Sequence, residues 1–134
     1  MSTSTAKSSS AIGLTKMVGF VITTQPEKAK SFYGNTLGFR FVKDDGFALV
    51  FDANGTMLRV AKLKEFTPAQ FTVLGWEVDD ITAAVATFKA KGITFERYPG
   101  LPQDEDAICS FGNEARVAWF KDPDGNVLSL SQHS

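Results

Sequence analysis

The sequence has few of the residue types from which metal sites and nucleophilic sites are usually built. Its 134 residues include one cysteine, Cys109, and one histidine, His133. A single cysteine rules out a disulfide within the chain and fits a reducing compartment such as the cytoplasm. No histidine lies near Cys109 in the sequence, which favours an inert thiol over a nucleophile.

An excess of charge of one sign and long apolar runs are also lacking. The sequence has 14 Lys and Arg against 15 Asp and Glu, so it offers no electrostatic reason for nucleic acid or a membrane surface as a partner. No apolar run could cross a bilayer, and residues 1–15 have no apolar segment typical of a secretory signal. We therefore expect a cytoplasmic protein with no nucleic-acid and no membrane partner. Residues 1–15 are expected to be a flexible lead-in, or an extra edge strand in an oligomer.

The sequence does contain one pattern twice: a strand, a helix and three further strands. Its hydrophobic content of 43% suits one globular domain, which we predict over residues 16–134 with unit one at 16–64 and unit two at 71–132. Strands are expected at 16–23, 39–43, 47–51, 56–62, 71–78, 93–97, 115–120 and 127–131. The two helices follow the first strand of each unit. Residues 98–114 form a long loop, part of which could pair as a short strand and which could cover a pocket.

Local signals mark the ends of these elements. Thr24 to Glu27 reads as a capping box with a proline in the first turn, and Asp79 or Asp80 is expected to cap the second helix. Asn54-Gly55 and Asp122-Pro123-Asp124-Gly125 are typical of hairpin turns. When the two units are aligned on these signals, Val18 corresponds to Val73 and Arg59 to Ser129.

Three short motifs, in this order and spacing, resemble the vicinal oxygen chelate superfamily. They are Phe32-Tyr33 before Leu37-Gly38-Phe39, Glu77-Val78-Asp79-Asp80, and Asp122-Pro123-Asp124-Gly125-Asn126. That superfamily includes glyoxalase I, extradiol dioxygenases, fosfomycin-resistance enzymes and bleomycin-binding proteins. The resemblance spans residues 17–132 and implies an α+β fold, in which two βαβββ units form curved mixed sheets around a trough. It also implies a homodimer, because an open trough leaves sheet edges to be covered.

In metal-dependent members of this superfamily, the trough floor carries four ligands, typically His or Gln, Glu, His and Glu. By motif distance, the corresponding positions here are Val18, Arg59, Val73 and Ser129. Valine has no lone pair, arginine is a permanent cation, and a neutral serine is a weak ligand. We therefore expect no metal and no cofactor at the usual place.

Strand parity suggests what occupies the trough instead. If Val18 faces it, so does Phe20; Met57 then accompanies Arg59, and Glu77 accompanies Val73. The opposite faces are apolar and are expected to pack under the helices; they hold Leu58, Val60, Leu74, Trp76, Val78, Leu128 and Leu130. The predicted ligand-binding residues are Arg59, Ser129, Glu77, Phe20, Met57, Val18, Val73 and Trp119.

Structural roles for the same side chains stay open. Arg59 could pair with Glu77 across the sheet or extend to the trough rim instead of contacting a ligand. Val18 and Val73 could fill the core, and Trp119 could serve packing alone.

Three functions are compatible with this pattern. The first is a metal-free protein that binds and sequesters a small molecule, with Arg59 holding an apolar or aromatic anion in the trough. The second is a lyase, isomerase or dioxygenase-type enzyme. That enzyme would either have an atypical metal site or need no cofactor, with Arg59 stabilising an oxyanion and Glu77 acting as base. The third is a module that associates with another protein, which no motif specifically marks.

Overall fold

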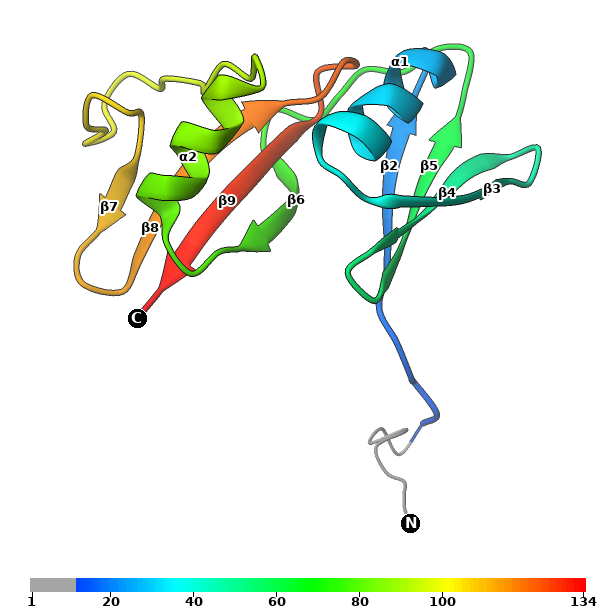
Figure 1. Cartoon of the computed structure of the whole chain (residues 1–134), viewed down its shortest axis with the longest axis horizontal. Coiled ribbons are helices and arrows are strands. Elements are labelled where there is room, and N and C mark those ends of the chain that lie inside the picture. Colours follow the sequence, from blue (N-terminus) through cyan, green and yellow to red (C-terminus); the bar gives the residue numbers. More distant parts are fainter. Residues whose placement is uncertain (1–11) are drawn as a thin grey trace.

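The computed structural model describes residues 12–134, so most of the predicted lead-in, residues 1–11, lies outside the described residues. Two four-stranded mixed sheets stand side by side, each with a helix on one face (Figure 1). The first sheet has the order β2-β5-β4-β3, and the second has β6-β9-β8-β7. The first contains β2 (Val18–Thr23), β3 (Arg40–Asp44), β4 (Ala48–Ala53) and β5 (Thr56–Lys62). The second contains β6 (Thr72–Glu77), β7 (Cys109–Phe111), β8 (Ala115–Lys121) and β9 (Val127–His133). This arrangement confirms the predicted α+β class with two βαβββ units.

The helices begin where the chain leaves the first strand of each unit. In unit one, α1 (Pro26–Ser31) continues into a π-helical turn, η1 (Phe32–Thr36). The predicted capping box, with Thr24 as its first residue, is wrong. Gln25 is the N-cap of α1 and makes no side-chain cap bond. The hydroxyl of Thr24 donates to Asp124. In unit two, α2 (Ile81–Ala90) is capped by Asp80, which accepts a hydrogen bond from the main-chain N–H of Ala83.

The second strand of unit two lies later in the chain than the sequence suggested. Residues 93–97 form no strand, and their only ladder contact is a bridge between Phe95 and Phe120. The edge of β8 is instead covered by β7, which comes from within the predicted long loop. The prediction of a strand at 93–97 is therefore wrong, since these residues reach only the end of β8, where the N–H of Glu96 donates to the carbonyl of Trp119.

One apolar core lies between the helices and the covered faces of the two sheets. All seven residues predicted for these faces belong to it or pack against it, which confirms the strand parity there. The rings of Phe32 and Phe120 lie 6.4 Å apart, and those of Phe39 and Trp76 lie 5.4 Å apart. Because each of these pairs joins unit one to unit two, the two units share their core.

The turn between β8 and β9 ties unit two to the start of α1 in unit one. Asp124 accepts hydrogen bonds from the hydroxyl of Thr23 and from both the N–H and the hydroxyl of Thr24. Burial alone would raise the pKa of Asp124, but these hydrogen bonds outweigh it and lower the pKa. The side-chain amide of Asn126 donates to the carbonyl of Ile22 at 2.9 Å. This predicted turn therefore also serves as a link between the units.

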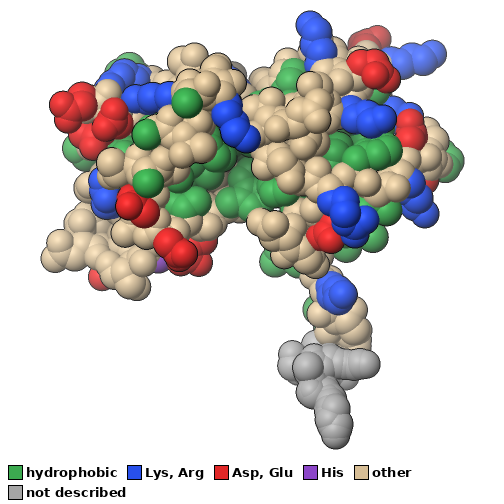
Figure 2. Space-filling model, in the orientation of Figure 1, with side chains coloured by type: hydrophobic (Ala, Val, Ile, Leu, Met, Phe, Trp, Pro, Cys, Tyr) green, Lys and Arg blue, Asp and Glu red, His purple; other side chains and the backbone are tan. Residues whose placement is uncertain are grey.

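Charged side chains are dispersed on the face seen in Figure 2, where basic and acidic groups alternate around its periphery. Within residues 12–134, no helix has the length and apolar character needed to cross a membrane.

Candidate ligand-binding site

The first sheet leaves one face uncovered by helices, and we call this its open face. Val18, Phe20 and Met57 lie on it with exposed fractions of 39%, 59% and 45%. In the register of the sheet, Phe20 stands beside Arg59 on β5, and Arg59 stands opposite Val50 on β4. The structure thus brings four of the predicted site residues onto one apolar surface with a cation among them.

The cation of this surface has a partner that the sequence did not indicate. Nη2 of Arg59 lies 2.7 Å from Oδ2 of Asp45, which belongs to the turn between β3 and β4. The alternative pairing of Arg59 with Glu77 is wrong: Glu77 lies at the end of β6 in the other sheet, and within residues 12–134 Asp45 is the carboxylate partner of Arg59. The hydrogen bond from Arg59, together with the N–H groups of Phe47 and Ala48, lowers the pKa of Asp45 to about 2.

The second sheet has an open face of its own, with Ser129 near its middle. Ser129 stands between Gly75 on β6 and Trp119 on β8 and is 8% exposed. A Cβ atom added to Gly75 would overlap Oγ of Ser129. Among residues 12–134 the hydroxyl of Ser129 has no hydrogen-bond partner, and a buried hydroxyl of this kind is suited to a bond with a ligand or water.

Two other predicted residues of this sheet lie away from Ser129. Val73 sits at a register shift of β6 and packs against the shared core. Glu77 is exposed at the end of β6, opposite Ser131. Arg59 and Glu77 come from different sheets, and no contact joins them within the described part of the chain. The arrangement therefore does not bring together the oxyanion stabiliser and the base considered above.

Two adjoining hollows open beside Trp119 at the hairpin end of the second sheet. They measure about 590 and 270 Å³ and share Gln70, Tyr98 and Val127 in their walls. The smaller hollow is also lined by Phe71 and Trp119. The rings of Tyr98 and Trp119 meet edge to face at 5.4 Å. Size and aromatic lining make this a suitable place for a flat apolar molecule.

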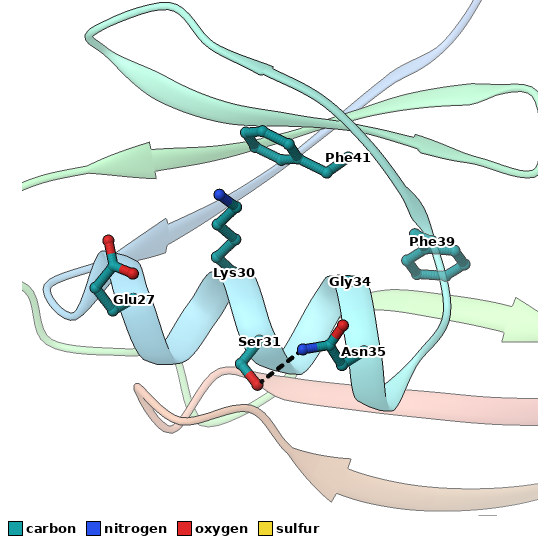
Figure 3. A pocket seen from close by; sticks show the side chains of 7 residues that line it. All are labelled: Glu27, Lys30, Ser31, Gly34, Asn35, Phe39 and Phe41. Carbon is teal, nitrogen blue, oxygen red and sulfur yellow. Dashed lines mark hydrogen bonds between the residues drawn. The ribbon is translucent and has the colours of Figure 1, made fainter.

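A further hollow of about 400 Å³ lies on the helical side of unit one, between α1, η1 and β3 (Figure 3). Nζ of Lys30 lies 4.3 Å from the centre of the Phe41 ring, a cation–π contact. The side-chain amide of Asn35 donates to Ser31 at 3.4 Å. None of the predicted site residues lines this hollow.

The four positions that would hold a metal in related folds do not fit one. They carry two valines, the guanidinium of Arg59 and the hydroxyl of Ser129, and this set lacks the imidazole and carboxylate donors of such sites. In residues 12–134, no three side chains of His, Cys, Asp or Glu come together in a way that could bind a metal ion.

Comparison with known proteins identifies the fold family. The model of the Glyoxalase/Bleomycin resistance protein/Dioxygenase superfamily matches residues 14–130. The chain belongs to this superfamily. A search of curated protein sequences returned no match.

Several solved structures have a similar fold at low sequence identity. FosX, a genomically encoded fosfomycin resistance protein from Listeria monocytogenes, superposes with a TM-score of 0.69 at 13% identity, over 88% of this chain and 92% of that chain. TnmS3, an antibiotic binding protein from Streptomyces sp. CB03234, gives 0.64 at 26% identity, over 89% and 97%. A superfamily protein from Alicyclobacillus acidocaldarius gives 0.66 at 17% identity, over 88% and 90%.

Several residues of the candidate site were missed in the sequence. Asp45 follows a strand and precedes Gly46. This pattern predicts a turn, but it does not predict that the carboxylate of Asp45 reaches Arg59 on β5. Tyr98 falls at the start of the long loop for which covering a pocket was one open role, so its position was indicated but its part in lining a hollow was not. Gln70 belongs to a connector without a recognisable motif, and Phe71 is the first residue of the predicted strand at 71–78, which does not indicate that its ring lines a hollow.

Proposed function

We propose that this superfamily member binds an apolar or aromatic small molecule on the open faces of its sheets without the usual metal, as a protein of the resistance or sequestration type. The observation that carries the proposal is the composition of the open faces. Exposed apolar side chains such as Phe20 and Met57 flank Arg59, which stands at one of the four positions where the resemblance places metal ligands. An apolar surface with few polar groups is the usual form of a small-molecule site.

The second sheet supports the same proposal by a separate observation. The buried hydroxyl of Ser129 lacks a partner among the described residues, and Trp119 beside it lines a hollow with Tyr98 and Phe71. FosX and TnmS3 are described as a fosfomycin resistance protein and an antibiotic binding protein, which favours antibiotic-like molecules among the first compounds to test.

We also propose that the protein acts as a homodimer. Phe20, Phe71 and Phe111 expose 59%, 69% and 45% of their surface, and exposed apolar surface can mark an interface between proteins. The strands β3 and β7 are the outer edges of the two sheets. A second copy would cover these surfaces and deepen the shallow face of unit one into a site.

A thermal-shift screen of aromatic and amphipathic compounds, antibiotics included, tests the binding proposal. A ligand at about 100 times its dissociation constant should add about 2.7 kcal/mol to the free energy of unfolding. Hits should lose affinity on Phe20→Ser or Trp119→Ala and keep it on Phe41→Ala, which alters the separate hollow on the helical side. A screen without any compound that raises the melting temperature would contradict the proposal.

A further inference from the structure

The turn between β3 and β4 places a fixed carboxylate over the open face of the first sheet. Oδ1 of Asp45 accepts the N–H groups of Phe47 and Ala48 at 3.0 and 2.9 Å. This leaves Oδ2 to accept a hydrogen bond from Nη2 of Arg59 at 2.7 Å. The turn therefore holds the carboxylate in place without a ligand, and the ion pair is part of the ligand-free site.

The ion pair remains within reach of a ligand. The side chains of Arg59 and Asp45 are each 26% exposed. Within residues 12–134 Arg59 gives only one N–H to a side-chain partner, whereas a guanidinium has five. Its neighbour Phe20 is 59% exposed and supplies an apolar surface next to the pair.

The other charges on this face do not create a strong anion site. Arg40 is opposite Asp52 in the sheet, and the two form an ion pair at 3.1 Å. Lys43 lies in the same row as Arg59, on the edge strand β3 and opposite Val50. It is exposed and stands two strands away from Arg59, roughly 10 Å, a distance at which exposed charges are largely screened.

This charge arrangement affects which ligand can bind beside Arg59. A carboxylate ligand would have to displace Asp45 or approach it closely, and two anions sharing one cation repel each other. A carboxamide meets no such repulsion, because its carbonyl can accept from a free N–H of Arg59 while its own N–H donates to Asp45. Both bonds would be charge-assisted.

We propose that the site selects an uncharged aromatic ligand that carries a hydrogen-bond donor beside an acceptor, as a carboxamide does, and that Asp45 determines this preference. The inference rests on the proposed function and defines its ligand class. It differs from the sequence-based expectation of an anion, which took Arg59 as an unpaired cation. Asp45 is a specificity residue that no motif in the sequence indicates.

Two probes of nearly equal shape test this inference on the full chain: 2-naphthamide and 2-naphthoate, titrated by fluorescence at neutral pH. The wild-type protein should bind the amide roughly tenfold more tightly than the carboxylate. Asp45→Asn keeps an oxygen acceptor for the turn but removes the charge, so it should shift the ratio of the two dissociation constants roughly tenfold toward naphthoate. Arg59→Gln should weaken naphthoate further, because Asp45 then stands alone.

Lys43→Ala is the matched control, since it removes a cation from the same face without touching the pair, and it should leave the ratio unchanged. Melting curves of each variant establish that it is folded. A wild-type preference for naphthoate, or a ratio that Asp45→Asn does not move, would overturn the inference and leave the proposed function standing. If neither probe binds at millimolar concentration, the proposed ligand class is wrong and the inference is overturned, while the thermal-shift screen still decides the proposed function.

Discussion

At the scale of single residues, one buried carboxylate, that of Asp122, links the two units. Asp122 is 6% exposed and accepts hydrogen bonds from the hydroxyl of Tyr33 at 2.6 Å and from the side chain of Asn126 at 2.8 Å. Burial and the nearby charge of Asp122 raise the pKa of Tyr33 well above its usual value. Tyr33 thus remains a neutral donor, which makes this second residue of the Phe-Tyr motif a structural one.

Tyr33→Phe should therefore destabilise the fold. It removes a donor from a buried carboxylate, at a cost of about 1–3 kcal/mol, measurable by chemical denaturation. Tyr98→Phe serves as control, because no hydrogen bond of its hydroxyl is found among the described residues, and it should change stability by less than about 0.5 kcal/mol. If both variants lost the same unfolding free energy, the hydrogen bond between Tyr33 and Asp122 would not be a specific source of stability.

The close approach of Gly75 and Ser129 gives a second prediction at this scale. Gly75→Ala should cost about 1–3 kcal/mol in unfolding free energy, because the added methyl group overlaps Oγ of Ser129. In a Ser129→Ala background the same change should cost much less, since the overlapping oxygen is gone. Additive losses in the double mutant would contradict the close packing of these two residues.

At the scale of elements, alternation of apolar residues predicted most of the strands correctly, because one face of each sheet is buried in the shared core. It failed at 93–97, where tertiary contacts rather than pattern decide which segment covers β8. The long loop that follows residues 93–97 is held by Gln103. The side chain of Gln103 accepts a hydrogen bond from the N–H of Tyr98 and donates to the carbonyls of Glu96 and Ala107. The residues that this hydrogen-bond network joins follow no periodic pattern in the sequence, so strand and helix patterns do not predict it.

Part of the candidate site was predictable from the sequence and part was not. The placement of Arg59 and Phe20 on one face follows from strand parity and was predictable. The partner of Arg59 was not, because Asp45 lies in a turn whose direction depends on side-chain packing and main-chain bonds. Val73 departs from its predicted row for a similar reason, since a register shift of β6 interrupts the alternation there.

The turn that holds Asp45 has a definite pH signature. The pKa of Asp45 is about 2, against a usual 3.8, so the stabilisation from this carboxylate is complete above about pH 4 and is lost as the pH falls through 2. In Arg59→Gln the main-chain bonds remain but the largest cause of the shift is removed, so the pKa should rise toward 3.8. Titration of the side-chain carboxyl carbon by NMR measures it, and an unchanged pKa would contradict the pairing.

At the scale of the whole molecule, the chain leaves much apolar surface on faces that its own helices do not cover. We expect sedimentation to give twice the chain mass of 14.6 kDa, and we expect Phe20→Asp to shift the protein toward monomer, because a charge on this face is costly to bury. Phe47→Asp, with its ring 79% exposed in the β3–β4 turn, tests whether the dimer extends over that turn. A monomer at high protein concentration would contradict the proposed assembly.

The central claim is that this member of the superfamily binds its ligand without the metal that related enzymes use. The most direct measurement is calorimetric titration of the strongest compound from the thermal-shift screen, before and after exhaustive treatment with a chelator. Our account predicts the same affinity and stoichiometry in both titrations, with affinity lost in Trp119→Ala or Phe20→Ser. Binding that disappears after chelation and returns when a divalent metal is added would contradict it.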